Sequence, residues 1–406
     1  MRGIPSLITD IRKKVFTEVA RMAYAGNDYT KAEDLPYVIV PGDQPLHRES
    51  VFLERAIAGE RVRLAMGLSV RSVQTRSLLT EGMDHAAIAQ QYYEPPLINI
   101  IPYACHACPT NQYKVTENCQ NCLAASCQQV CPRDAISFVN GKSFIDPGKC
   151  IKCGKCAQAC DYNAIIHLER PCQAACGMDA IGMDENGKAL INQDKCVSCG
   201  QCLVSCPFGA IVDKGQIYQV VRSIVEGDEV YAIAAPAFAS QFGKDVTVGR
   251  LRAAIQALGF KDMVEVAVGA DICTVEEARD FVEKVPAEQP YMATSCCPAW
   301  HAMVHKLFPA QAKNISMTLT PMVYTARMVK KDHPGAKIVF VGPCAAKKLE
   351  AIRENIRSDV DFVLTFEELQ GMFEAKEVDF ETLPEVGPLD EGTAAGRGFA
   401  VAGGVA

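Results

Sequence analysis

The chain has 406 residues, of which 49% are apolar and 22% charged, and its formal net charge is -7 at pH 7. This length exceeds one ordinary hydrophobic core, so we expect a globular protein with more than one domain. The acidic balance disfavours a nucleic-acid partner. The sequence shows neither a secretory signal nor the ~18 uncharged apolar residues that a membrane helix needs, so we expect a cytoplasmic protein without a membrane partner.

Residues 1–100 contain no cysteine and are predicted to form a helical N-terminal segment. Apolar residues at helical spacing predict one helix over about residues 6–25 and a second over 51–66. The second helix is expected to carry paired Arg and Glu residues on its outer face. Residues 36–45 are predicted to be loop or extended structure. Nothing in the segment indicates chemistry, and we expect it to pack against or cap the region that follows.

Sixteen of the 20 cysteines fall between Cys105 and Cys206, most of them in CxxC and CxxxC steps. A cubane iron–sulfur cluster takes four cysteine ligands, so the number predicts a chain of 4Fe–4S clusters. Residues 127–136 recur as 172–181, and each copy runs into a CxxCxxCxxxC block. We therefore predict that residues 101–215 form tandem, consecutive ferredoxin-like domains of the α+β class, each holding two clusters.

The spacing also predicts which cysteines share a cluster, because the fourth cysteine of a ferredoxin block ligates the other block's cluster. The rule gives three groups: Cys119, Cys122 and Cys127 with Cys160; Cys150, Cys153 and Cys156 with Cys131; and Cys196, Cys199 and Cys202 with Cys176. The cysteines left over are Cys105, Cys108, Cys172 and Cys206. A fourth cluster on these four requires the fold to bring the first pair back to the others.

Two alternatives concern this region. Zinc also binds paired CxxC steps, but the CxxCxxCxxxC spacing favours iron–sulfur clusters. His106, between Cys105 and Cys108, stays open as a ligand, a neighbour of the cluster or a solvent-facing side chain. Asp161 and Gly177 stand where ferredoxins usually have proline, and we expect them to shift cluster potential through local charge and solvent access.

From residue 229 the sequence alternates between apolar runs and helical patterns. The runs at 230–235 and 337–342 are continuous and end near Pro or Gly, as buried parallel strands do. Residues 229–406 are therefore predicted to form an α/β domain with a parallel sheet.

Two helices are predicted in this domain from periodicity. The first covers residues 248–258. The second covers 275–285, and it is expected to begin at Thr274, with Glu277 completing a capping box.

Two segments of this domain resemble signature motifs of the iron-only (FeFe) hydrogenases. Residues 294–300, Thr-Ser-Cys-Cys-Pro-Ala-Trp, resemble the family's TSCCPGW motif, and residues 342–350, Gly-Pro-Cys-Ala-Ala-Lys-Lys-Leu-Glu, resemble MPCxxKxxE. Ala-Pro-Ala at 235–237 resembles the family's entry motif, and the ferredoxin-like region matches its usual N-terminal arm. The resemblance covers about residues 100–406.

The resemblance implies reversible reduction of protons to dihydrogen at an H-cluster, a 4Fe–4S cubane bridged to a diiron unit. Reduced ferredoxin is the implied electron donor, and H-cluster maturation proteins are further implied partners. The implied roles are cubane ligation by Cys297 and Cys344, proton transfer by Cys296, hydrogen bonding to a cyanide ligand by Lys347, lining of the diiron pocket by Pro236 and Ala237, and a proton path through Glu277, Asp280 and Ser316.

Ordinary structural roles stay open for several of these residues. Glu277 and Asp280 could be solvated carboxylates one helical turn apart, and Lys347 could belong to a charged helix surface. Cys296 by itself could be a small buried residue. Cys273 matches no motif and is expected to be buried and inert.

The chain also departs from the family pattern. Gly342 replaces the usual Met, so an apolar contact is expected to be missing or supplied elsewhere, and Ala299 replaces Gly. No cysteine follows Cys344, so the third signature motif with its two cysteines is not found. We expect a truncated form of a longer hydrogenase, inactive as it stands, with a split enzyme as the alternative. The alternative function is a non-catalytic redox sensor or electron-transfer subunit.

Overall fold

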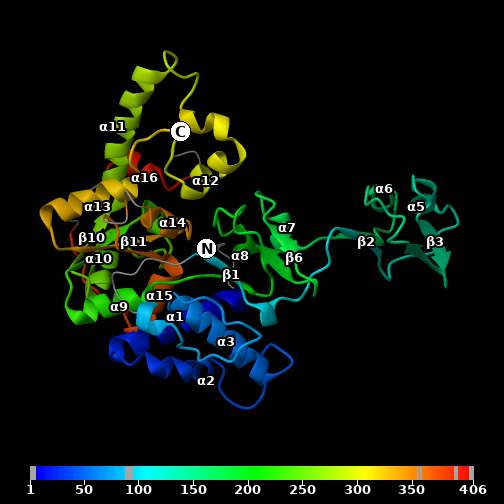
Figure 1. Ribbon diagram of the computed structural model, residues 1–406, viewed down its shortest axis with the longest axis horizontal. Coiled ribbons are helices and arrows are strands. Elements are labelled where there is room, and N and C mark those ends of the chain that lie inside the picture. Colours follow the sequence, from blue (N-terminus) through cyan, green and yellow to red (C-terminus); the bar gives the residue numbers. More distant parts are fainter. Residues whose placement is uncertain (1–5, 87–94, 354–355, 357–358, 388–391, 402–406) are drawn as a thin grey trace.

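The computed structural model describes residues 6–86, 95–353, 356, 359–387 and 392–401 (Figure 1). This part of the chain consists of a helical N-terminal layer, an α/β domain, and an arm of small two-stranded sheets that extends away from both. None of the described helices is long and apolar enough to cross a membrane.

The helices are α1 (Leu7–Ala25), α2 (Leu35–Ile39), α3 (Val51–Ala65), α4 (Met83–Ala86), α5 (Ser126–Gln129), α6 (Lys155–Gln158), α7 (Pro171–Ala174), α8 (Gln201–Ser205), α9 (Ile217–Glu226), α10 (Val248–Ala257), α11 (Val266–Lys284), α12 (Pro298–Leu307), α13 (Pro321–Asp332), α14 (Lys347–Ala351), α15 (Phe366–Ala375) and α16 (Ala394–Gly398). The strands are β1 (Ile98–Ile100), β2 (Gln112–Val115), β3 (Ile136–Val139), β4 (Lys142–Ile145), β5 (Ile165–Leu168), β6 (Ile181–Met183), β7 (Ala189–Ile191), β8 (Ile211–Asp213), β9 (Val230–Ala234), β10 (Asp262–Glu265), β11 (Lys337–Gly342) and β12 (Phe362–Thr365).

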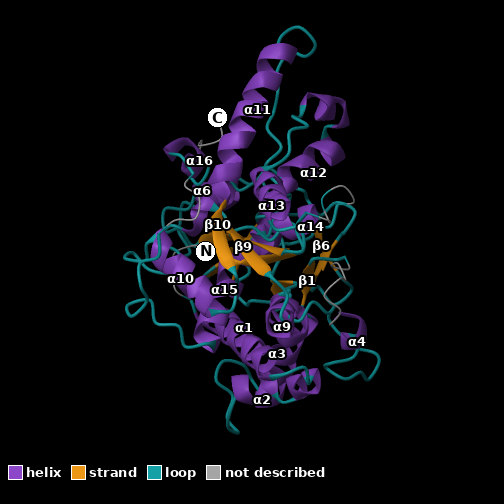
Figure 2. Ribbon diagram, turned by 90° about the vertical axis from the view of Figure 1, so that its left-hand side faces the viewer, coloured by secondary structure: helices purple, strands orange, loops and turns teal. Residues whose placement is uncertain are grey.

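The α/β domain is built on a four-stranded parallel sheet in the order β10-β9-β11-β12. The two apolar runs that predicted buried strands form β9 and β11, which are neighbours in the sheet, so that prediction is confirmed. Helix α13 lies on one side of the sheet, and α15, backed by α1 and α9, lies on the other (Figures 1 and 2). Both strands are apolar throughout because each face of the sheet is covered.

The N-terminal helices contact both other parts of the molecule. Ser6 caps α1, its hydroxyl accepting from the Thr9 amide at 3.3 Å, and the helix packs along α15 of the α/β domain. Helix α3 also contributes Ile57 and Leu64 to the apolar core beside Cys172. The segment therefore packs on the α/β domain as well as on the arm.

Two N-terminal predictions need correction, the first of them only in part, because residues 40–45 are loop as expected. Residues 35–39 form the short helix α2, with Pro36 in its first turn, where proline needs no amide partner. The charged face of α3 points inward, since Glu60, Arg61 and Arg63 are all buried. These side chains bond to backbone and to other side chains of neighbouring segments, which periodicity alone does not reveal.

The start predicted for the second helix of the α/β domain is also wrong. Helix α11 begins at Val266, directly after β10, and Thr274 lies in its interior. The Thr274 hydroxyl donates to the Ala270 carbonyl at 2.9 Å, a bond back to the preceding turn that threonine often makes inside helices. The first helix, α10, begins as predicted, capped by Thr247.

The arm holds two ferredoxin-like units, but they are not consecutive. Strand β1 pairs antiparallel with β8 and closes one unit, whereas β2 pairs antiparallel with β5 and closes the other. Residues 112–168 are therefore inserted between Cys108 and Cys172, and the inserted unit forms the far end of the arm (Figure 1). The prediction of tandem consecutive units is wrong because the β2–β5 pair returns the chain to its starting point.

Candidate iron–sulfur and catalytic sites

The structure brings sixteen thiols together in four groups, and each group surrounds one cavity. The groups are Cys119, Cys122, Cys127 and Cys160; Cys131, Cys150, Cys153 and Cys156; Cys176, Cys196, Cys199 and Cys202; and Cys105, Cys108, Cys172 and Cys206. The four spaces are partly open to solvent and have empty volumes of about 330–420 Å³. Among the residues that the structure describes, no three His, Cys, Asp or Glu side chains converge as ligands of a single metal ion.

One turn recurs after one cysteine of every group and was missed as a fourfold pattern in the sequence. The turns read CPRDAI, CDYNAI, CGMDAI and CPFGAI, beginning at Cys131, Cys160, Cys176 and Cys206. The fourth residue of each has positive φ, which suits Asp, Asn and Gly: Asp134, Asn163, Asp179 and Gly209. The amide of the alanine that follows then donates to the cysteine Sγ, at 3.3–3.4 Å: Ala135, Ala164, Ala180 and Ala210.

A second amide donates to one more sulfur in each group. The donors are Ser143 to Cys119, Lys152 to Cys150, Ser198 to Cys196 and Ala189 to Cys105, at 3.3–3.4 Å. Amide hydrogen bonds to sulfur stabilise the thiolate form, which is the form that ligates iron. Four thiols around an otherwise mostly apolar space, with two amides directed at their sulfurs, fit a 4Fe–4S cluster.

The group containing Cys202 offers a direct test of this fit. Burial raises the pKa of the Cys202 thiol to about 12, so the thiolate needs iron to hold it. Replacing Cys202 with serine is expected to lower the iron and acid-labile sulfide content by one cluster, measured on anaerobically reconstituted protein. Cys273→Ser, a buried cysteine outside the four groups, is the control and is expected to leave the iron content unchanged.

The Cys176–Cys202 group lies against the α/β domain. Cys176 and Cys196 belong to the same apolar cluster as Ala299, Ala346 and Cys344. This cluster of apolar side chains joins the cysteine group to the two segments that carry the hydrogenase-like motifs. The Cys176–Cys202 group is therefore adjacent to the Cys344 segment.

The motif cysteines meet where β11 ends and α12 begins. Cys297 is the N-cap of α12 and is exposed, whereas Cys296 and Cys344 are half-buried. Burial raises the pKa of Cys344, and the charge of Cys297 adds to the effect while Lys347 opposes it. Burial likewise raises the pKa of Cys296, again with Lys347 opposing. The three thiols and the lysine therefore act on one another electrostatically.

Lys347 does not belong to a solvated helix surface. Its ammonium donates to the Glu350 carboxylate at 2.6 Å, and Glu350 is fully buried. The Thr320 hydroxyl donates to the other oxygen of that carboxylate. The Lys347 ammonium also lies 6.0 Å from the Phe340 ring centre. These contacts orient the lysine beside the motif cysteines.

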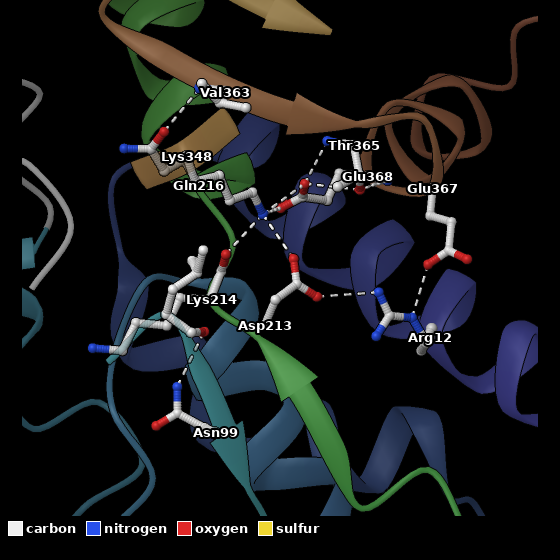
Figure 3. Close-up of polar contacts among 11 residues, drawn as sticks. Arg12, Asn99, Asp213, Lys214, Gln216, Lys348, Val363, Thr365, Glu367 and Glu368 are labelled. Atoms are coloured by element: carbon white, nitrogen blue, oxygen red, sulfur yellow. Dashed lines mark hydrogen bonds and ion pairs between the residues drawn. The ribbon is translucent and has the colours of Figure 1, made fainter. Parts of the chain in front are cut away.

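The next residue, Lys348, forms the centre of a buried ionic network (Figure 3). Its ammonium donates to Asp213 at 3.0 Å, to Glu368 at 3.1 Å and to the Lys214 carbonyl at 2.7 Å. Arg12 binds the second Asp213 oxygen at 3.3 Å. Burial raises the pKa of Asp213, but Lys348 and Arg12 outweigh it and hold that pKa at about 2. The network joins α14, which begins at Lys347, to β8, α15 and α1.

The proposed proton-path residues also lie near one another. Burial raises the pKa of Glu277, and its hydrogen bond with Ser316 partly offsets this rise. The Ser316 oxygen accepts from the Thr318 amide at 3.1 Å, so its hydroxyl is free to donate to Glu277. Asp280 pairs with Lys284 at 2.9 Å in a partly exposed salt bridge. Glu277 is therefore not a freely solvated carboxylate, whereas Asp280 faces solvent.

Cys273 lies close to this path, one helical turn before Glu277. It is buried as expected, and burial together with Glu277 and Cys296 raises its pKa to about 12. Sequence reasoning gave no signal for its closeness to the motif cysteine, because the two lie on different elements.

Pro236 and Ala237 lie in the short turn that follows β9, and Ala237 packs against the main core. The structure explains the departure at Gly342. A Cβ atom there would lie 2.5 Å from the Phe340 ring, so that ring occupies the space beside the glycine.

Comparison with known families agrees with this organisation. The profile described as iron only hydrogenase large subunit, C-terminal domain, matches residues 228–406. An LdpA Fe-S cluster-binding domain profile matches 166–217, and a 4Fe-4S binding domain profile matches 144–166.

Similar curated proteins include hydrogenases. Iron hydrogenase 1 of Clostridium pasteurianum is 30% identical over 344 residues, covering 76% of this chain and 58% of that protein. A periplasmic Fe hydrogenase large subunit of Nitratidesulfovibrio vulgaris is 33% identical, covering 67% of this chain and 66% of that subunit. The chain thus spans less than two thirds of either relative's length.

A second kind of relative and a solved structure complete the comparison. Cytosolic Fe-S cluster assembly factor NAR1 of Yarrowia lipolytica is 33% identical over 38% of this chain and 35% of that protein. The solved apo FeFe-hydrogenase HydA1 of Chlamydomonas reinhardtii is 26% identical, with a TM-score of 0.38, covering 42% of this chain and 49% of that one.

Proposed function

The chain belongs to the iron-only hydrogenase family, and from this premise we propose that it catalyses the reversible reduction of protons to dihydrogen. The observation that carries the proposal is the meeting of Cys296, Cys297, Cys344 and Lys347 beside the Cys176–Cys202 group. Electron-carrying and catalytic motifs are thereby adjacent in one molecule. An H-cluster, when bound, supplies the redox chemistry at iron.

The residues of this chain have separate tasks in the proposal. Cys297 and Cys344 would supply two of the four thiolate ligands that a cubane takes, and Lys347, held by Glu350, would present a cation to the anionic part of the cofactor. Cys296 and Glu277 exchange protons between the pocket and the surface. Ser316, Asp280, Pro236 and Ala237 complete the path and the pocket wall.

The proposed electron donor is reduced ferredoxin, which would deliver electrons to the inserted unit at the far end of the arm. Cys122 and Cys153 of that unit are exposed, so its two cysteine groups approach the surface. Electrons would then pass through the remaining two groups to the Cys344 segment. H-cluster maturation proteins are the second proposed class of partner.

The test uses the protein matured anaerobically with a synthetic diiron cofactor. With reduced ferredoxin we expect sustained hydrogen evolution, measured by gas chromatography, and its abolition by Cys296→Ser at unchanged iron content. Matured protein with all its iron but without hydrogen evolution or uptake would overturn the proposal.

A second candidate is an electron carrier or sensor without hydrogen turnover. The sequence similarity to a cytosolic Fe-S cluster assembly factor favours it, because that relative is named for cluster assembly and not for hydrogen turnover. The same experiment separates the two candidates. A carrier would accept electrons from ferredoxin, seen as bleaching of its iron–sulfur absorption, and would evolve no hydrogen.

A further inference from the structure

Two buried arginines flank the group formed by Cys105, Cys108, Cys172 and Cys206. Arg61, on α3, is 6% exposed and donates to the Gly209 carbonyl at 3.0 Å, within the turn that follows Cys206. Arg170, directly before α7, is 2% exposed and lines the cavity itself. It donates to the Cys108 carbonyl at 2.9 Å. Arg61 therefore contacts the turn after Cys206, and Arg170 contacts the backbone at Cys108.

Neither guanidinium has a carboxylate partner among the described residues. The acceptors of Arg61 and Arg170 are backbone carbonyls, and the Nε atom of each has no hydrogen-bond partner. Two other buried arginines are ion-paired, Arg12 with Asp213 and Arg252 with Asp262, whereas buried Arg63 also bonds only to backbone carbonyls. An unpaired buried cation is unstable unless an anion lies nearby.

The missing anion belongs at the cysteine group. Burial, together with the neighbouring cations Arg12 and Arg48, lowers the pKa of Arg61 to about 10. Cys206 acts in the opposite direction, as an anionic thiolate would. A cluster on four thiolates carries net negative charge in both of its oxidation states.

Among the described residues, the other three groups have no buried cation of this kind; the cation that contacts the Cys176–Cys202 group, Lys306, donates to the Cys196 carbonyl at 2.8 Å but is exposed. Charged residues at the cavities around Cys119 and Cys131 are exposed: Asp161 at the first, Arg133 and Lys152 at the second. The lining of the Cys176–Cys202 cavity includes no charged residue. Water screens exposed charges far more than buried ones, so the buried arginines dominate the comparison.

We propose that Arg61 and Arg170 are the counter-charges of the cluster held by Cys105, Cys108, Cys172 and Cys206, and that they make it the highest-potential cluster of the four. Reduction adds one negative charge to the cluster, and a buried cation stabilises the reduced form more than the oxidised form. The first electron to enter the arm therefore settles on this cluster.

Because this cluster lies on the path of electron transfer, its higher potential would make it hold an electron between the inserted unit and the Cys176–Cys202 group. The inserted unit leaves the chain just after Cys108, and Cys172 and Cys176 lie one turn apart at α7. Electrons from the inserted unit thus meet this cluster before the Cys176–Cys202 group. The inference rests on the cluster ligation proposed above and not on hydrogen turnover.

The test is a redox titration of the reconstituted protein, followed by electron paramagnetic resonance. Arg61→Gln keeps a donor for the Gly209 carbonyl but removes the charge, whereas Arg61→Lys keeps the charge. We expect Arg61→Gln to lower the reduced-to-oxidised ratio of one cluster at least tenfold at fixed potential, about 59 mV for one electron. Arg61→Lys is expected to retain most of the wild-type ratio.

Two further variants make the result specific. Arg63→Gln is the matched control: Arg63 is buried on the same helix, but it donates to the carbonyls of Ser69 and Leu79, away from the cysteines. It is expected to leave every cluster potential unchanged. Cys108→Ser identifies the cluster. The reduction step that this variant alters in the titration must be the step whose potential Arg61→Gln lowers.

Several outcomes would overturn the inference. It fails if Arg61→Gln shifts no reduction potential or if Arg63→Gln produces the same shift. It also fails if the reduction step that shifts is not altered by Cys108→Ser. Loss of the cluster in both Arg61 variants would assign the arginine a folding role instead. Wild-type protein with iron for three clusters only would overturn the ligation of the fourth group, whatever its hydrogen activity.

Discussion

Replacing Lys348 with methionine is expected to lower the free energy of unfolding of the α/β domain by roughly 3–5 kcal/mol. Methionine fits the buried volume but leaves Asp213 and Glu368 facing each other without their shared cation. Removing one partner of a buried ionic network costs more than the network itself contributes, because the remaining charges have lost their water. Urea unfolding followed by the fluorescence of Trp300, the only tryptophan, measures the change.

The control is Lys331→Met, at an exposed position at the end of α13, which is expected to change stability by no more than about 0.5 kcal/mol. The pH dependence adds a second readout. Without Lys348 the two carboxylates take up protons more readily in the folded than in the unfolded state. The destabilisation should therefore be greatest near neutral pH and should shrink as the pH falls. A pH-independent loss would show that packing, not charge, is responsible.

Replacing Glu277 with glutamine is expected to lower hydrogen turnover by on the order of 10²–10⁴-fold, because the amide keeps the shape but cannot take up and release a proton. Glu277 is the carboxylate that both bonds to Ser316 and acts on Cys273. The iron content and the spectra of the clusters should stay unchanged. Hydrogen evolution with reduced ferredoxin is the measurement.

The neighbouring carboxylate gives the matched control for that prediction. Glu276 lies on the same helix and pairs with Arg279 at 3.0 Å at the surface, so Glu276→Gln should retain the wild-type rate. If both variants were equally slow, a general effect on α11 would explain the loss. If Glu277→Gln kept full activity, the proton path would have to run elsewhere.

The local patterns of the sequence determined the main features of the arm and the sheet. The spacing of the cysteines depends on loops of fixed length around a cluster, so the first three groups are found together as grouped from the sequence. The apolar runs that became β9 and β11 reflect burial on both faces of a strand. The motifs at 294–300 and 342–350 could be found in the sequence for the same reason, because each is one continuous stretch.

What only the tertiary structure decided is how segments distant in sequence meet. The β2–β5 pair returns the chain so that Cys105 and Cys108 reach Cys172, which no local spacing specifies. The same holds for charge: the paired Arg and Glu residues of the second helix were expected on its outer face, but packing against neighbouring segments buries Glu60, Arg61 and Arg63, and Arg61 lies beside a cysteine group. Periodicity reports which residues share a side of a helix. It does not report which neighbour covers that side, and the neighbour decides whether a charge is solvated, paired or directed at a cluster.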